Sequence, residues 1–362
     1  MRSWVEISRS AIRDNFRAVR AAVGDSVDVM PVVKADAYRH GAIEVSKILE
    51  AEGARWLAVS NVEEGVVLRQ SGIAARILVM ADYLPEERPA LEEFHLTPVI
   101  HSLDDVASAR VPYHLKIDSG MGRLGARESA EKIVAAIASS PAPLEGLMTH
   151  FASAANYESS QTEDQIAYFE SVLAHLRGAG ISPRYVHLSS TIPIAYGRAN
   201  AWGNLVRPGH AIYGYVSPAR GAAPKLGLRV RPALSWKAKI LATKDIAPGA
   251  LVGYGGIHRA QRPMRIAILA AGYADGIPHR LGNRGHVIAK GKKLPITGAV
   301  SMDLTTIDVT ACPDLCVGDS VMLLGKENGV SIDAQEIARV AGTISYSVLC
   351  GISARVKRVY VD

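Results

Sequence analysis

The residue of this sequence that is best suited to chemistry is a lysine that follows an apolar run. The stretch VMPVVKADAYRHGA (29–42) presents Lys34 at the end of that run, and a small polar turn with a glycine follows at once. A lysine amine among apolar residues and other cations loses affinity for its proton, and its free lone pair can then form a Schiff base with a carbonyl group. The alternative interpretation is a solvated charge at the rim of the fold.

Further apolar segments along the chain also end in polar residues that such a reaction could use. Each of these residues alone could be structural, for example as a helix cap or a salt-bridged rim residue. Their common position at segment ends indicates a single site. The residues are Tyr38 and His40 after the first segment, Lys116 within the fifth segment, Arg123 after the fifth segment, His150 at the end of the sixth, Ser190 and Thr191 after the seventh, and Arg207 at the end of the eighth.

Eight short apolar segments alternate with amphipathic stretches between residue 28 and about residue 213, which predicts βα units and a parallel sheet. Eight such units in this length favour a (β/α)8 barrel over an open doubly wound sheet, and a barrel would gather the polar segment ends at one face. The predicted strands are 29–33, 56–60, 76–80, 97–100, 113–118, 144–150, 184–188 and 203–207.

The pattern changes after about residue 228 to apolar runs separated by glycine and proline turns, such as MRIAILAAGYADG and HVIAKGKKLPITGAVSMDLTTIDVT. This sequence pattern is typical of a mostly antiparallel β domain. We therefore expect a barrel over residues 1–228 and a β domain over residues 229–362.

The composition of the chain limits the classes of function that it can have. The chain has 362 residues, a formal net charge of +6 and scattered Lys and Arg without aromatic interleaving, so we expect no nucleic-acid partner. Neither a signal-like apolar segment nor a run of about 20 apolar residues occurs, so we expect a cytoplasmic protein without a membrane association. The odd set of Cys312, Cys316 and Cys350 argues against a disulfide framework, and no His or Cys pair nearby completes a metal site, so no metal is expected.

These motifs together resemble the alanine racemases. VVKADAYRHGA is similar to the lysine signature of that family, and its other motifs follow in order: LKIDSGMGRLG, THFASA, VRPGHAIYG, GYADG, GAVSMDLTTIDV and SYSVLCGISARV. The opening WVEISRSAIRDNFRAVR fits as well, so the resemblance covers nearly the whole chain. It implies pyridoxal 5'-phosphate as cofactor and a head-to-tail homodimer with shared active sites.

The resemblance also implies roles for single residues. Lys34 would form the Schiff base and act as one of two catalytic bases, and Tyr273 in GYADG would be the second base, supplied by the partner subunit. Arg207 would donate to the pyridine nitrogen of the cofactor, with His150 beside it. Because guanidinium keeps its protons, this nitrogen would stay unprotonated, which weakens the ring as an electron sink and disfavours transamination.

Arg123 would lie near the cofactor's phenolic oxygen and the substrate carboxylate, held by a carbamylated Lys116. Met302 and Asp303 would belong to the substrate-side loop of the other subunit. The phosphate-binding positions fall on Tyr38, Ser190, Thr191, Gly209, His210 and Tyr346. The chain departs from the family pattern at Ser190 and Thr191, where asparagine and serine are usual, at Asp36 and Arg39, where asparagine and glycine are more frequent, and at Ser301, which replaces a common cysteine.

The expected activity is the interconversion of L- and D-alanine by two bases on opposite faces of the cofactor plane, which would supply D-alanine for peptidoglycan. A serine or broad-spectrum amino-acid racemase would share every motif. Barrel-type decarboxylases pair the pyridine nitrogen with an acid, so Arg207 argues against them. A non-catalytic carrier of pyridoxal phosphate would lack the β domain, so Tyr273 argues against that class.

Overall fold

The structure is a computed structural model that describes residues 1–362, and the chain forms two compact units. The barrel unit comprises residues 11–37 and 42–231, and the β unit comprises residues 1–10, 38–41 and 232–362. The C-terminal limit of the barrel unit lies close to the expected boundary. The division differs from the expected one because the first ten residues and a short segment after Lys34 belong to the β unit.

The barrel unit is built on eight parallel strands in chain order, so the predicted (β/α)8 barrel is confirmed. Six of them form one sheet in the order β3-β4-β5-β6-β7-β8, and β2 pairs in parallel with β9. A parallel bridge between Val32 and Ala58 joins the first strand segment to β3, and the N–H of Arg207 donates to the carbonyl of Ser189 to join β9 to β8. The strands are β2 (Asp28–Val29), β3 (Trp56–Val59), β4 (Arg76–Val79), β5 (Leu96–Ile100), β6 (Tyr113–Lys116), β7 (Leu144–Met148), β8 (Tyr185–His187) and β9 (Leu205–Val206).

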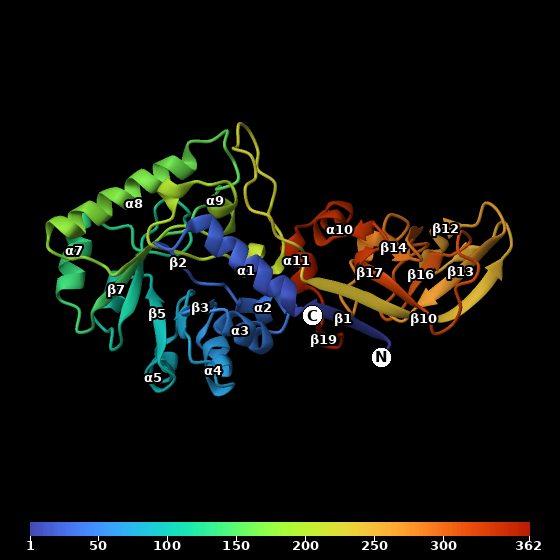
Figure 1. Ribbon diagram of the computed structural model, residues 1–362, viewed down its shortest axis with the longest axis horizontal. Helices are drawn as coiled ribbons and strands as arrows, with labels where there is room; N and C mark the ends of the chain where they lie inside the picture. The colour runs from blue at the N-terminus through green and yellow to red at the C-terminus, as the bar shows by residue number, and fades with distance from the viewer. The chain divides into compact units, whose positions relative to one another are not determined.

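Helices connect these strands and cover them with apolar faces. The longest helix, α8 (Gln161–Gly178), buries Phe169, Leu173 and Leu176 and lies beside α7 (Ala130–Ala138), both green in Figure 1. The side chain of Asn61 caps α4 by accepting from the N–H of Glu64. The other helices are α1 (Arg9–Val23), α3 (Ala42–Ala51), α4 (Val62–Gln70), α5 (Arg88–Glu93), α6 (Leu103–Val106), α9 (Thr191–Ala195), and the 3-10 turns η1 (Pro85–Glu87), η2 (Ala199–Ala201) and η3 (His210–Tyr213).

The turn after Lys34 is left-handed. In α2 (Lys34–Arg39), the five residues from Ala35 to Arg39 have φ between 52° and 65°. Left-handed helical backbone costs roughly 1–2 kcal/mol per residue for side chains other than glycine. Hydrogen bonds offset part of this cost, since the Asp36 carboxylate accepts from the N–H of Ala42 at 2.8 Å and Glu64 accepts from the N–H of Ala35 at 2.7 Å.

The β unit is a mostly antiparallel sheet, as expected. Its strand order is β15-β14-β17-β10-β1-β19, with β13 paired to β10 and β16 and with β18 paired to β17. Strand β1 lies between β10, to which it is antiparallel, and β19, to which it is parallel. The strands are β1 (Ser3–Ser8), β10 (Leu234–Ile246), β11 (Leu251–Val252), β12 (His258–Arg259), β13 (Met264–Leu269), β14 (His286–Ala289), β15 (Lys292–Pro295), β16 (Thr305–Asp308), β17 (Ser320–Glu327), β18 (Val330–Ile332) and β19 (Lys357–Val361).

Two helices and two 3-10 turns complete the β unit. They are α10 (Ala334–Ala341), α11 (Ser345–Cys350), η4 (Tyr254–Gly256) and η5 (His279–Leu281). Asp333 caps α10 by accepting from the N–H of Glu336, and Gly342 ends it in the left-handed conformation that suits glycine.

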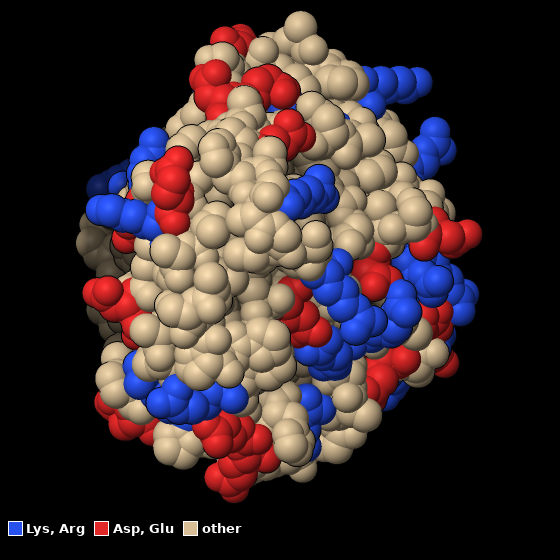
Figure 2. All heavy atoms as spheres, turned by 90° about the vertical axis from the view of Figure 1, so that its left-hand side faces the viewer, with Lys and Arg blue, Asp and Glu red and all other residues tan.

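The surface and the helices bear on two classes of partner. On the face that Figure 2 shows, Lys and Arg side chains lie among Asp and Glu side chains, which differs from the one-signed stripe of many nucleic-acid-binding proteins. Among the helices, not one is both long and apolar enough to cross a membrane.

Candidate active site

Five of the predicted site residues lie within electrostatic reach of one another in the barrel unit. Burial and then the positive charges of Arg207, Lys116, Arg123 and Lys34, in that order, together lower the pKa of His150 to about 3. His150 follows β7, Lys116 ends β6 and Lys34 follows the first strand segment. The barrel therefore gathers these groups at the carboxyl ends of its strands, where the sequence predicted them.

Arg207 is the most deeply buried cation of this cluster, with 2% of its surface exposed. Its Nη1 donates to the carbonyl and the Nδ1 of His187, both at 2.8 Å. Its Nη2 donates to the carbonyls of Thr149 and Leu188 at 2.7 and 3.0 Å. The structure records no protein acceptor for the Nε–H, so that group remains for a ligand. Burial lowers the pKa of Arg207 to about 9.

The protonation of His150 follows from its contact with Arg207. Nη2 of Arg207 lies 3.3 Å from Nδ1 of His150, and guanidinium has only donors, so Nδ1 must be the acceptor. The proton of the neutral imidazole is therefore on Nε2. Gln165 fixes the backbone here, because its side-chain amide donates to the His150 carbonyl at 3.1 Å.

Lys116 is buried, with 4% of its surface exposed. Burial, followed by the charges of Arg123 and Arg207, lowers its pKa to about 8. The neighbouring Asp118 does not neutralise it by an ion pair. Instead, one oxygen of the Asp118 carboxylate accepts from the N–H groups of Gly120, Met121 and Gly122 at 3.1, 2.9 and 3.0 Å, which shapes the loop that leads to Arg123.

The predicted phosphate-binding residues of the barrel unit lie at the starts of two short helical turns. Ser190 directly precedes α9, and Gly209 directly precedes η3, which begins at His210. The Thr191 hydroxyl oxygen accepts from the N–H of Ala211 at 3.1 Å and so joins the two turns. Backbone N–H groups at the start of a helical turn lack partners within the turn and attract anions.

Two residues near this cluster escaped the sequence analysis. His101 directly follows β5, and burial together with the charge of Lys116 lowers its pKa to about 4. Its place after a strand was the signal that could have identified it. Glu64 supports the turn after Lys34 by accepting from the N–H groups of Ala35 and Ser60, both at 2.7 Å. Its place three residues after the cap residue Asn61 suggested only a helix start.

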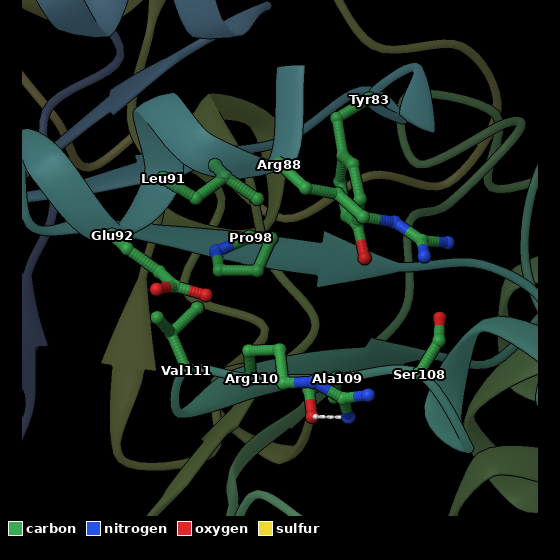
Figure 3. Close-up of a pocket in the computed structure, with 9 residues that line it drawn as sticks. All are labelled: Tyr83, Arg88, Leu91, Glu92, Pro98, Ser108, Ala109, Arg110 and Val111. Carbon is green, nitrogen blue, oxygen red and sulfur yellow. Dashed lines mark hydrogen bonds between the residues drawn. The ribbon is translucent and has the colours of Figure 1, made fainter. Parts of the chain in front are cut away.

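Two cavities of the barrel unit lie away from these site residues. One, of about 20 Å³, lies between α5 and β5 and is lined by Tyr83, Arg88, Leu91, Glu92, Pro98, Ser108, Ala109, Arg110 and Val111 (Figure 3). A second, of about 230 Å³, lies beside Phe16, Arg55 and Trp56. The candidate site is therefore identified by the cluster of polar and charged side chains at the strand ends and not by either of these cavities.

In the β unit, the predicted Tyr38 and Tyr346 lie together, with ring centroids 5.9 Å apart. Burial, with smaller contributions from Tyr346 and Cys350, raises the pKa of Tyr38 well above its usual value. Its phenol therefore keeps its proton at neutral pH and acts as a hydrogen-bond donor.

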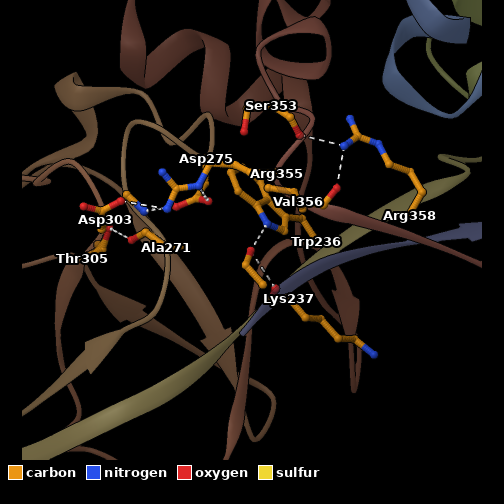
Figure 4. A network of polar contacts seen from close by, with 12 residues as sticks. Trp236, Lys237, Ala271, Asp275, Asp303, Thr305, Ser353, Arg355, Val356 and Arg358 are labelled. Carbon is orange, nitrogen blue, oxygen red and sulfur yellow. Dashed lines mark hydrogen bonds and ion pairs between the residues drawn. The ribbon is translucent and has the colours of Figure 1, made fainter. Parts of the chain in front are cut away.

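The loop that carries Tyr273 is fastened to the loop of Met302 and Asp303. The N–H of Tyr273 donates to the carbonyl of Ser301 at 2.9 Å. Arg355 forms ion pairs with both Asp275 and Asp303, at 3.0 and 2.8 Å (Figure 4). The Tyr273 and Met302 side chains are 45% and 54% exposed. The β unit therefore presents both side chains to its surface on a braced pair of loops.

Comparison with known proteins identifies the family of this chain. The family model described as "Alanine racemase, N-terminal domain" matches residues 7–218, and "Alanine racemase, C-terminal domain" matches residues 233–360. A relative named alanine racemase from Halothermothrix orenii is 39% identical over 99% of this chain and 96% of its own length. Another, from Carboxydothermus hydrogenoformans, is 39% identical and covers 99% of both chains.

Solved structures give the same result. The alanine racemase of Clostridium difficile 630 is 32% identical, has a TM-score of 0.92 and covers 100% of this chain and 96% of its own. The alanine racemase of Bartonella henselae, solved with covalently bound pyridoxal phosphate, is 25% identical, has a TM-score of 0.87 and covers 100% of both chains. In sequence and in fold, over its full length, this chain belongs to the alanine racemase family of isomerases.

Proposed function

We propose that this chain interconverts L- and D-alanine with pyridoxal 5'-phosphate, and that Lys34 and Tyr273 transfer protons on opposite faces of the substrate. The product D-alanine would enter peptidoglycan. The observation that carries this proposal is the cation cluster at the strand ends, in which the Nε–H of Arg207 is left without a protein acceptor.

The residues present fit pyridoxal phosphate. When bound through its carbonyl to the amine of Lys34, the cofactor supplies an electron-withdrawing ring that acidifies the Cα–H of an amino acid. The Nε–H of Arg207 suits a ring nitrogen that lacks a proton, because guanidinium donates hydrogen bonds without giving up its proton. The turns at Ser190 and Gly209 offer N–H groups and hydroxyls to a phosphate.

Tyr38 and Tyr346 stay proposed phosphate donors. The raised pKa of Tyr38 supports a donor role for it, since a phenolate would repel a phosphate. The position of His210 at the start of η3 supports its proposed role through the backbone N–H.

For Lys116 we propose carbamylation. Carbon dioxide reacts with a neutral amine, the new N–C bond forms as a proton leaves the nitrogen, and a carboxylate replaces the ammonium. A pKa of about 8 leaves part of the Lys116 amine neutral under physiological conditions. The resulting carboxylate would attract Arg123, where the ammonium repels it, and would hold the guanidinium ready for the substrate carboxylate.

A second copy of this chain is proposed as the partner that receives Tyr273, in a head-to-tail homodimer. The exposure of Tyr273 within one chain supports this proposal. Other large apolar side chains of the β unit are also exposed, as is expected of a surface that is covered on assembly. They are Leu251, Tyr254, Ile257, Met302 and Leu304. Met302 and Asp303 would then face the partner's substrate.

The test is α-proton exchange. The purified protein is incubated in D2O with L-alanine, and α-deuterium and the D-enantiomer are followed together. Deuterium in both enantiomers supports racemisation by two groups. Deuterium exchange with no D-enantiomer would contradict it, and so would release of carbon dioxide.

A serine or broad-spectrum racemase remains the second candidate, because Ser190, Thr191 and Ser301 depart from the family pattern noted above. The same assay with L-serine separates the two. A kcat/KM for serine above that for alanine would favour the second candidate.

A further inference from the structure

A chain of buried polar side chains runs from Arg207 into the interior of the barrel unit. Nη1 of Arg207 lies 2.8 Å from Nδ1 of His187, and Nε2 of His187 lies 2.8 Å from Nδ1 of His114. Both imidazoles are fully buried. Nε2 of His114 then faces the Glu145 carboxylate at 3.8 Å. These residues lie on or directly after β9, β8, β6 and β7.

The proton positions along this chain follow from Arg207. Because guanidinium only donates, Nδ1 of His187 must accept, and the His187 proton must be on Nε2. The Nε2–H of His187 then donates to Nδ1 of His114. The proton of the neutral His114 ring must therefore be on Nε2 of His114, which faces Glu145. Burial, followed by the charge of Arg207, lowers the pKa of His187 well below its usual value, and burial lowers that of His114. Both rings are therefore neutral and oriented in one direction.

Glu145 is fixed at the far end of this chain as a charged group. Its carboxylate receives two hydrogen bonds from the Arg76 guanidinium, at 2.6 and 2.5 Å. Burial raises the pKa of Glu145, but the nearby His114 ring and Arg76, through its hydrogen bonds and charge, together lower it to about 2. Arg76 in turn lies over the buried ring of Trp56, with its guanidinium carbon 4.0 Å from the ring centroid.

The backbone next to Glu145 leaves room for this arrangement. A Cβ on Gly146 would lie 2.6 Å from the His114 ring, so only glycine allows the imidazole to lie there. His114 is also packed between Trp56 and Tyr185, with ring centroids 5.4 and 5.8 Å away. The ring therefore cannot turn to exchange its two nitrogens without displacing neighbours.

We propose that Glu145, acting through His114 and His187, is a positioning residue for Arg207 that keeps the Nε–H of the guanidinium directed at the pyridine nitrogen of the cofactor. The structure records no carboxylate within ion-pair distance of Arg207, whose acceptors are carbonyls and imidazole nitrogens. Glu145 supplies the negative charge from a distance, so the guanidinium is oriented without a contacting carboxylate. This inference rests on the proposed function.

The first test reads the protons directly. In the unsubstituted protein labelled with 15N-histidine, NMR should show an unprotonated Nδ1 and a protonated Nε2 for both His114 and His187, assigned with His114→Gln and His187→Gln. A protonated Nδ1 or an imidazolium at either residue would overturn the proposal. This reading needs no substitution of Glu145 and no cofactor.

The second test separates positioning from general structural support. Glu145→Gln, Glu145→Asp and the control Glu163→Gln are stripped of cofactor, and dissociation constants are measured for pyridoxal phosphate and for its 1-deaza analogue, which has no ring nitrogen. Glu163 pairs with Arg198 at 3.7 Å in the same unit, so its substitution also removes an ion pair. If Glu145→Gln misdirects the guanidinium, the charge-assisted hydrogen bond from Arg207 to the pyridine nitrogen is lost. This loss predicts about tenfold weaker binding of pyridoxal phosphate to Glu145→Gln and unchanged binding of the analogue.

Glu145→Asp should restore part of the preference for pyridoxal phosphate over the analogue. Glu163→Gln should bind both ligands as the unsubstituted protein does. Equal losses for both ligands in Glu145→Gln would mean a merely structural role and would overturn the proposal. Failure of the unsubstituted protein to bind pyridoxal phosphate, or to prefer it over the analogue, would instead contradict the proposed function.

Discussion

Gly272 lies so close to Ser301 that a Cβ on Gly272 would be 2.3 Å from the Ser301 carbonyl oxygen. The same Cβ would be 2.4 Å from the carbonyl oxygen of Met302. The two loops that carry Tyr273 and Met302 are therefore in contact through backbone atoms, and no side chain fits between them.

Gly272→Ala should displace Tyr273 and lower kcat by at least about tenfold, because misplacement of a reacting group by about 1 Å is costly. The barrel unit should keep its fold and its cofactor absorbance. Gly178→Ala is the control, since a Cβ there meets no atom within 4 Å. Unchanged kcat in Gly272→Ala would show that the phenol position does not depend on this contact.

Lys34 should be the residue that binds the cofactor. The purified protein should be yellow, and borohydride should fix pyridoxal phosphate on the peptide that contains Lys34. Lys34→Ala should be colourless. The measurement is absorbance followed by peptide mass spectrometry. Label on another lysine would exclude the assigned role.

Tyr273→Phe should keep the cofactor, its colour and the dimer, yet lose most turnover in both directions. Its remaining α-proton exchange should be lopsided, because only the enantiomer that exchanges at Lys34 retains its base. Exchange of each enantiomer is measured by NMR in D2O.

Mixing Tyr273→Phe with Lys34→Ala subunits should restore activity, since a heterodimer has one site with both groups. Random exchange predicts recovery of about a quarter of the original activity. Absence of recovery after verified subunit exchange would mean that both groups come from one chain.

The lowered pKa of Lys116 predicts how bicarbonate and pH act on it. In bicarbonate, 13C NMR should show a carbamate that Lys116→Arg lacks. Without bicarbonate, the folded chain binds fewer protons at this lysine than the unfolded chain between about pH 8 and the usual lysine pKa of 10.5. The free energy of unfolding should therefore rise with pH across this interval, and Lys116→Met should lose that rise. A plain amine in bicarbonate-grown crystals would favour a bound anion instead.

The left-handed turn after Lys34 predicts unequal effects at Asp36. Asp36→Ala removes the acceptor for the Ala42 N–H and should lower the free energy of unfolding by about 1–2 kcal/mol. Asp36→Asn should be nearly neutral, because asparagine keeps an acceptor and tolerates this backbone conformation. Urea unfolding measures both. Equal losses would show that the carboxylate charge, rather than the hydrogen bond, stabilises the turn.

The sequence predicted the eight barrel strands because each is a short apolar run, and it predicted the strand-end cluster because parallel strands direct their carboxyl ends to one face. The left-handed backbone from Ala35 to Arg39 has no such signal, since neither its alanines nor its tyrosine favour that conformation. His114 and His187 could not be foreseen as partners either. They are 73 residues apart, and a histidine within an apolar strand does not reveal which side chain it meets.

The position of β1 between β10 and β19 limits how the gene can be cut. The two family models meet between residues 218 and 233, which invites expression of the C-terminal part alone. Such a fragment would lack residues 3–8 and would leave β10 and β19 with unpaired backbone groups facing each other across a missing strand. Exposed strand edges recruit other chains, so the fragment would aggregate. A usable fragment must carry the first ten residues as well, either fused through a linker or added as a peptide.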